Sequence, residues 1–178
     1  RRCEEADWEC VIVTGDRDSL QLIDQNVHVK LVISKPGQTT ATLYTEEKFR
    51  EEYGFDPPRM VDLKSLMGDS SDNIPGVAGI GPKTATELLT KFGTLDGIYA
   101  NLEDKSIRPK LREKLQTGED MAYLSYELAT IVCEAPIEFK PEDALCQAPD
   151  KEKLFDLFTR LEFVKLMDRY GLRDVPAA

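Results

Sequence analysis

Long apolar runs, histidine and clustered cysteines are all scarce in this sequence. No stretch of its 178 residues approaches the roughly 20 consecutive apolar residues that a membrane helix needs. Histidine occurs once, and no CxxC pair occurs among the four cysteines, which are Cys3, Cys10, Cys133 and Cys146. This pattern argues against zinc and favours free thiols in a reducing compartment. With 41% hydrophobic and 31% charged residues, the composition is typical of a soluble globular protein.

The common nucleotide-binding motifs are also absent. The Walker pattern GxxxxGK[ST] does not occur, and the glycine-rich segment 76–81 does not directly follow a strand, as a Rossmann fingerprint would. The net charge of −10 argues against wrapping nucleic acid by bulk electrostatics. The charge is uneven, however, since residues 57–92 carry four basic and four acidic groups. That stretch would become locally positive if a metal ion neutralised Asp69 and Asp72.

Local patterns divide the chain into an α/β part, residues 1–56, and a helical part, residues 57–178. The apolar run at 10–14 predicts a buried parallel strand, and two further strands are predicted at 27–34 and 40–45, around a turn at 35–38. Thr45 begins a predicted helix that runs to Tyr53. Later helices are predicted between Pro82 and Gly93 and at 94–101, 108–116, 118–133, 150–160 and 162–170. Residues 173–178 are typical of a linker.

Two pairs of aspartates are candidate metal ligands. Asp16 and Asp18 follow the first predicted strand, where open α/β sheets bind ligands, and in an extended segment their side chains would point the same way. Asp69 and Asp72 would share one face if their segment were helical. Carboxylates without nearby histidine or cysteine suit Mg²⁺ or Mn²⁺, and two such ions would serve in-line phosphodiester hydrolysis. The alternative is that "GDSSDN" is only a capped turn.

The segment "IPGVAGIGPKTA" is a candidate phosphate-binding loop. Its apolar residues Val77 and Ile80 can anchor it in the core, while its glycines leave backbone N–H groups uncovered. A helix then starts at Pro82, and a helix N-terminus is a ready site for phosphate. The residues expected to hold a duplex backbone without reading bases are Gly76, Gly79, Gly81, Lys83 and Thr84. The alternative is a tight turn between helices, in which glycine serves only steric needs.

Two passages together carry a resemblance to a known family. "VIVTGDRDSLQL" and, further along, "LKSLMGDSSDNIPGVAGIGPKTATELLTKFGTLDGIYANL" resemble the 5′-3′ exonuclease domain of bacterial DNA polymerase I, within the flap endonuclease family. The likeness runs along nearly the whole chain, including "RLEF" and "YGL" near its end. It implies the carboxyl-terminal part of a PIN-like α/β nuclease core, joined to an all-α helix-hairpin-helix (H3TH, SAM-like) domain. It also implies a nuclease that cuts 5′ flaps and nicked duplex DNA during replication and repair.

The resemblance assigns roles to the candidate residues. Asp16 and Asp18 match metal-binding carboxylates beside the catalytic ions, and Asp69 and Asp72 match the pair at a second metal. Residues 76–84 match the hairpin that holds duplex DNA, which in the family also carries K⁺ on main-chain carbonyls, here those of Val77 and Ile80. The implied cofactors are two Mg²⁺ or Mn²⁺ ions. The implied setting is the bacterial cytoplasm at the nucleoid, with a polymerase domain downstream in the parent chain.

The sequence also departs from the family pattern. Aspartates from two earlier strands, a Glu-Ala-Asp-Asp motif and the arch that threads the flap all have no match in it. Glu5-Ala6-Asp7 lies too close to the first strand to be that motif. We therefore expect a fragment that is a weak or inactive nuclease by itself. Two alternatives stay open: a non-catalytic, sequence-independent duplex-binding module, and a purely structural helical domain.

Overall fold

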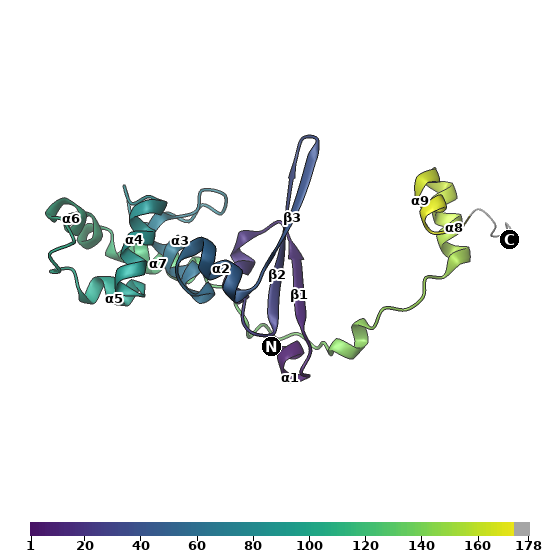
Figure 1. Ribbon diagram of the computed structural model, residues 1–178, viewed down its shortest axis with the longest axis horizontal. Coiled ribbons are helices and arrows are strands. Elements are labelled where there is room, and N and C mark those ends of the chain that lie inside the picture. Colours follow the sequence, from purple (N-terminus) through teal and green to yellow (C-terminus); the bar gives the residue numbers. More distant parts are fainter. Residues whose placement is uncertain (173–178) are drawn as a thin grey trace. The chain divides into compact units, whose positions relative to one another are not determined.

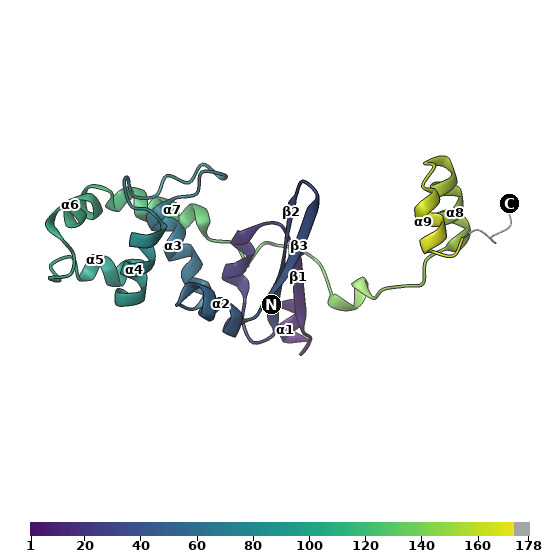
Figure 2. The same ribbon diagram turned by 45° about the horizontal axis from the view of Figure 1, so that its top comes forward.

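The computed structural model describes residues 1–172, so the predicted linker at 173–178 lies outside the described part. The chain forms two compact units, Arg1–Glu138 and Phe139–Ala178. Figures 1 and 2 show the elements of each unit. The predicted boundary between residues 56 and 57 stays a prediction, and one hydrophobic core continues across it from Leu20 to Ala122.

The first unit begins with a short helix, α1 (Arg2–Glu5), and a three-stranded sheet. Strand β1 (Cys10–Thr14) pairs in parallel with β2 (Val27–Lys35), which pairs antiparallel with β3 (Gln38–Tyr44). The 3-10 helix Arg17–Leu22 lies in the crossover between β1 and β2. The three predicted strands are therefore present.

The sheet is covered on one face only. Val29 and Leu31 on β2 are buried, whereas Val11 and Val13 on β1 are 45% and 65% exposed. The predicted parallel pairing of β1 is confirmed. The predicted burial of β1 is wrong, because no element among the described residues covers the side of the strand that carries Val11 and Val13. Residues 32–35 of β2 and their partners in β3 extend past β1 as a two-stranded ribbon (Figure 1).

Helices form the rest of the first unit. These are α2 (Glu46–Tyr53), α3 (Met60–Met67), α4 (Pro82–Phe92), α5 (Leu95–Ala100), α6 (Pro109–Thr117) and α7 (Glu119–Ala129), with a 3-10 turn at Pro57–Arg59. The predicted cap at Thr45 is confirmed, since its hydroxyl accepts the Lys48 amide. The limits of α4 are those that Pro82 and Gly93 predict. Most predicted helix bounds agree within two residues.

Helix α7 ends at Ala129, four residues before its predicted end. Thr130 adopts an extended conformation there. The side-chain amide of Gln21 donates to the Ala129 carbonyl and accepts from the Ile131 amide, both at 3.0 Å. Gln21 thus satisfies the backbone where the helix stops, and it ties this end of α7 to the 3-10 helix that follows β1.

Helix α3 lies at the centre of the first unit and packs against both α4 and α7. Every residue from Met60 to Leu66 is buried, including three polar side chains. Each of these three has a partner. Asp62 accepts the Leu95 amide at 2.7 Å, Ser65 donates to a backbone carbonyl of its own helix, and Lys64 forms an ion pair with Asp69. A buried helix that satisfies its polar groups in this way fixes the positions of its neighbours.

The second unit contains a 3-10 turn at Pro141–Ala144 and the helices α8 (Lys151–Arg160) and α9 (Val164–Arg169). Asp150 caps α8 by accepting the Lys153 amide. Phe158 is the buried aromatic residue of this pair of helices and packs edge-on against Tyr170. Within residues 1–172, no helix is long and apolar enough to cross a membrane.

Candidate metal and nucleic-acid site

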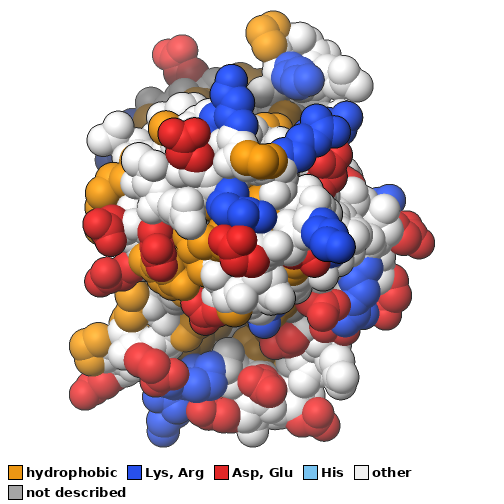
Figure 3. Space-filling model, turned by 90° about the vertical axis from the view of Figure 1, so that its left-hand side faces the viewer, with side chains coloured by type: hydrophobic (Ala, Val, Ile, Leu, Met, Phe, Trp, Pro, Cys, Tyr) orange, Lys and Arg blue, Asp and Glu red, His pale blue; other side chains and the backbone are white. Residues whose placement is uncertain are grey.

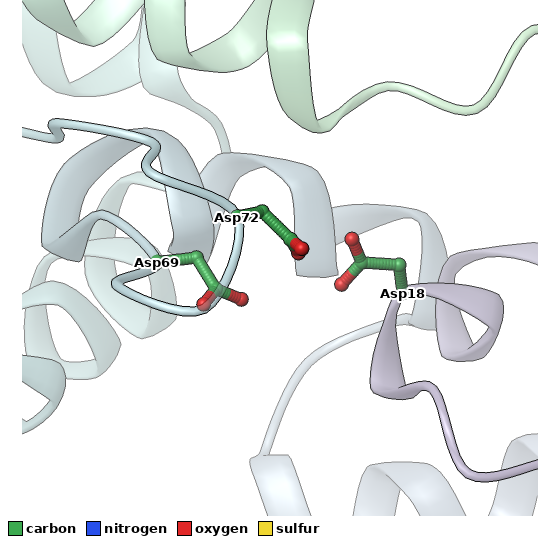
Figure 4. Close-up of side chains that lie close together, drawn as sticks. All are labelled: Asp18, Asp69 and Asp72. Carbon is green, nitrogen blue, oxygen red and sulfur yellow. The ribbon is translucent and has the colours of Figure 1, made fainter.

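Three aspartates from two distant segments meet in the first unit. Asp18, Asp69 and Asp72 each offer a carboxylate oxygen, and these oxygens lie within 4.8 Å of one another. Figure 4 shows the carboxylates of Asp18 and Asp72 pointing toward each other, with Asp69 beside them on the loop after α3. We call these three residues the acidic cluster. Asp18 and Asp69 are half-buried and Asp72 is exposed, so the cluster is open to solvent.

Asp18 is positioned by the chain immediately after β1. Thr14 accepts the Asp16 amide at 3.0 Å, and the Asp16 carboxylate then accepts the Asp18 amide at 2.9 Å. Asp16 is thereby the N-cap of the 3-10 helix Arg17–Leu22. The predicted extended segment is wrong, because this cap starts a helical turn at Arg17. Among the described residues Asp16 is not part of the acidic cluster, and its role as a metal ligand stays a prediction.

Asp69 and Asp72 lie on a tight turn rather than on a helix. The backbones of Asp69 and Ile74 exchange two hydrogen bonds of 2.9 Å, which close the turn. One carboxylate oxygen of Asp69 accepts the amide and the hydroxyl of Ser71. The helical spacing assumed for this pair is therefore wrong, and the capped turn is present. The other oxygen of Asp69 faces the acidic cluster.

A lysine that no sequence pattern singles out lies within this cluster. Lys64 on α3 is only 4% exposed, and its ammonium is 2.6 Å from Asp69 Oδ2 and in close contact with Asp18. This ammonium, with help from the Ser71 hydrogen bonds, lowers the pKa of Asp69 to about 2. Asp69 is therefore a carboxylate at neutral pH. Three carboxylates and no nitrogen or sulfur ligand form a donor set for a hard divalent cation.

The glycine-rich loop between α3 and α4 leads directly on from the acidic cluster. Val77 and Ile80 are 3% and 4% exposed, so their predicted role as apolar anchors is confirmed. The Val77 amide donates to the Leu66 carbonyl at 2.8 Å, and the Ile80 amide donates to the Val77 carbonyl at 3.0 Å. We call residues 75–81 the hairpin. It joins α3 and α4 as a helix-hairpin-helix.

Individual glycines in the hairpin meet different demands. Gly76 has φ +62°, and a Cβ there would lie 2.2 Å from the Gly68 nitrogen, so its backbone crosses that of Gly68 too closely for any side chain. A Cβ on Gly81 would meet no atom within 4 Å. Gly81 and Lys83 are exposed at the start of α4, where backbone N–H groups and the helix dipole favour an anion.

Two residues from later helices brace the hairpin. Ser125 on α7, which is fully buried, accepts the Gly76 amide at 2.9 Å, and Lys114 on α6 donates to the Gly79 carbonyl at 2.8 Å. The sequence offered no signal for either contact, since the partners lie 49 and 35 residues apart. Basic and acidic side chains are interspersed over the face in Figure 3, so no patch of one sign covers it.

Comparisons with known proteins identify the family. The family model described as "5′-3′ exonuclease, C-terminal SAM fold" matches residues 55–152. The chain is 48% identical to DNA polymerase I of Caldicellulosiruptor bescii over 94% of its length, and 39% identical to that of Bacillus subtilis over 96%. It spans about a fifth of the length of these relatives, 19% in each case.

Solved structures show the same fold. A T5 5′-exonuclease structure with bound divalent zinc ions has a TM-score of 0.59 at 24% identity, over 72% of this chain and 45% of that one. The Rad2 catalytic core in complex with DNA substrate has a TM-score of 0.64 at 17% identity, over 95% of this chain and 58% of that one. The expected fold, a small sheet of a PIN-like nuclease followed by SAM-like helices, is confirmed. The chain therefore belongs to the 5′-3′ exonuclease family of bacterial DNA polymerase I, whose C-terminal SAM fold it contains.

Proposed function

We propose that this chain is part of a metal-dependent 5′-3′ exonuclease and structure-specific flap endonuclease. One observation carries the proposal: Asp18 is brought to Asp69 and Asp72, and the turn that holds this pair runs directly into the hairpin. A metal site and a phosphate-binding backbone thus share one short segment. A substrate strand held by the hairpin would lie a few residues from the acids.

Asp18, Asp69 and Asp72 would hold Mg²⁺ or Mn²⁺, with Asp16 as a further carboxylate beside the same 3-10 helix. When bound, such ions activate water and stabilise the leaving oxygen of a phosphodiester. The T5 5′-exonuclease structure with bound divalent ions supports a divalent metal as the cofactor. The protein's own contribution is to hold carboxylates ionised: the Lys64 ammonium and the Ser71 hydrogen bonds keep Asp69 charged at neutral pH.

The hairpin and the start of α4 would bind duplex DNA that carries a 5′ flap or a nick. Gly81 leaves the backbone at the start of α4 open to a phosphate, Lys83 adds a positive charge and Thr84 a hydroxyl. Gly76 is buried against Gly68 and Gly79 lies against Lys114, so these two glycines shape the hairpin rather than contact DNA. The Rad2 structure with DNA substrate supports a nucleic-acid partner. In a parent DNA polymerase I, the activity would serve replication and repair at the nucleoid in the bacterial cytoplasm, beside a polymerase domain.

An ammonium group already lies at the hairpin, beside the expected K⁺ ligands Val77 and Ile80. The Val77 carbonyl already accepts the Ile80 amide, and the neighbouring Gly79 carbonyl already has the Lys114 ammonium at 2.8 Å. A second cation would be repelled by that ammonium. We therefore propose no step that depends on K⁺ at Val77 and Ile80.

Cleavage of a 5′-labelled flap duplex in Mg²⁺ or Mn²⁺ tests the proposal. We expect cleavage that is weak, since acids of the family pattern have no match in these residues, and that disappears in Asp72→Asn. Asp72 is exposed, so this variant should fold. Glu87→Gln, an equal loss of charge at an exposed site on α4, should cut like the wild type. Cleavage that persists in Asp72→Asn would contradict the proposed metal site.

Duplex binding in a chelator separates the remaining possibilities. Binding without any cleavage would favour the non-catalytic DNA-binding module. Absence of both would favour a structural helical domain. In either case nuclease activity would be rejected for this chain by itself.

A further inference from the structure

Lys114 connects helix α6 to the hairpin across 35 residues of sequence. Its ammonium donates to the Gly79 carbonyl at 2.8 Å. Gly79 has φ +77°, and a Cβ there would lie 2.6 Å from the Lys114 nitrogen and 3.2 Å from its terminal carbon. Glycine at this position therefore both permits the backbone conformation and leaves room for the end of the lysine side chain.

The contact holds both polar groups of a single peptide unit. The carbonyl of the Gly79–Ile80 peptide accepts from Lys114, and its N–H donates to the Val77 carbonyl at 3.0 Å. With both ends bonded, this peptide plane cannot rotate without breaking a hydrogen bond. It is followed immediately by Gly81 and Pro82, which begin α4. Its orientation therefore sets the direction in which the chain enters that helix.

The same side of the hairpin is packed against the turn between α6 and α7. A Cβ on Gly118 would lie 2.7 Å from a methyl group of Val77, so the two backbones are separated by little more than that side chain. Pro75, Gly76, Lys114 and Met121 line a groove of about 440 Å³ beside this contact. Lys114 is the charged donor that reaches from this groove to the hairpin backbone.

We propose that Lys114 is a positioning residue for DNA binding, which acts as a built-in cation at the hairpin. The Lys114 ammonium fixes the orientation of the Gly79–Ile80 peptide. It also offsets the partial negative charge of the Gly79 carbonyl oxygen beside the expected phosphate. This rests on the proposed function in one respect, that the hairpin is where DNA binds. The bracing itself is a property of the free protein and can be tested without DNA.

Lys114→Met tests this role, with Lys110→Met as the matched control. Lys110 is exposed on the same helix, so its replacement removes an equal charge without touching the hairpin. Binding to a nicked duplex is measured in a chelator, at one ionic strength, in potassium chloride and in tetramethylammonium chloride. We expect the wild type to bind equally in both salts. Lys114→Met should bind about tenfold more weakly in tetramethylammonium and recover in potassium, since only a small cation can reach the freed carbonyl.

Rescue by potassium is the readout that a purely structural lysine would not give. Equal behaviour of Lys114→Met and Lys110→Met in both salts would overturn the proposal, as would a loss in Lys114→Met that potassium does not restore. If the wild type binds no DNA, the proposed function fails while this inference is still decided by hydrogen exchange. In that measurement the Ile80 amide should exchange at least about tenfold faster in Lys114→Met than in Lys110→Met. Unchanged exchange would refute the bracing.

Discussion

The side-chain nitrogen of Lys64 lies 2.6 Å from Oδ2 of Asp69, inside the acidic cluster formed with Asp18 and Asp72. A buried helix thus places a fixed positive charge among three carboxylates. This charge relieves their mutual repulsion in the free protein. It also means that a divalent ion entering the cluster competes with an ammonium for the same oxygens.

Replacing Lys64 by methionine should strengthen metal binding. The variant removes the competing ammonium and leaves the site one charge unit more negative, so we expect the affinity for Mn²⁺ to rise by about tenfold or more. Calorimetric titration with Mn²⁺ measures this directly. Lys30→Met, at an exposed position of β2, is the control for loss of one charge. Weaker Mn²⁺ binding in Lys64→Met would mean that the ammonium organises the site more than it competes for it.

Replacing Ser125 by alanine should destabilise the first unit. The Gly76 amide, which donates to the Ser125 hydroxyl at 2.9 Å in a buried environment, would lose its acceptor. A buried unsatisfied group costs about 1–3 kcal/mol, and we expect the free energy of unfolding in urea to fall by that amount. Tyr126→Phe removes a hydroxyl from the next, exposed residue of α7 and should change stability little. Equal stability of the two variants would show that water replaces Ser125.

Gly76 and Gly81 should respond very differently to alanine. A Cβ at Gly76 would lie 2.2 Å from the Gly68 nitrogen at a positive φ, so Gly76→Ala should lower stability by about 3 kcal/mol or more, or prevent folding. A Cβ at Gly81 has open space, and Gly81→Ala should leave the thermal midpoint nearly unchanged. Duplex binding by Gly81→Ala should nevertheless weaken, because its methyl group stands where we expect the phosphate. Full binding by Gly81→Ala would place the DNA elsewhere.

Tyr44 should make stability fall in alkaline solution. Burial, and the hydrogen bond that its hydroxyl donates to Glu52 at 2.8 Å, raise the pKa of Tyr44 to about 12. In the unfolded chain a tyrosine titrates near a pH of about 10. Because the fold favours the neutral phenol, the raised pKa of Tyr44 adds to the free energy of unfolding. This stabilisation is complete below a pH of about 10 and is lost as the pH rises through 12. Urea denaturation at a series of pH values, compared with Tyr44→Phe, measures it, and parallel curves for the two proteins would contradict it.

Local sequence signals predicted the elements well because the responsible interactions are local. Thr45 bonds within its own helical turn, and Pro82 and Gly93 set the limits of α4 through backbone geometry. The same reasoning failed where two local preferences competed. Asp16 caps a 3-10 turn instead of extending the strand, and the Asp69 carboxylate closes a turn instead of standing on a helix.

The parts of the site that sequence did not predict all depend on packing between distant segments. Lys64 meets Asp18 across 46 positions, and Ser125 meets Gly76 across 49. A buried lysine or serine has no characteristic spacing from such partners. Ser125 reaches Gly76 only after α7 packs against α3, and Lys64 reaches Asp18 only after α3 packs against the 3-10 helix that follows β1. The acids and the hairpin could be proposed from sequence. The side chains that hold the acids and brace the hairpin could not.

Mn²⁺ binding followed by electron paramagnetic resonance tests the central claim most directly. The wild type should bind Mn²⁺ at a saturable site, and binding should be lost in Asp18→Asn and in Asp72→Asn but kept in Glu87→Gln. That result would establish that residues from two distant segments form one metal site. Equal binding by all four proteins would contradict the account, because the acidic cluster would then not be where the metal is held.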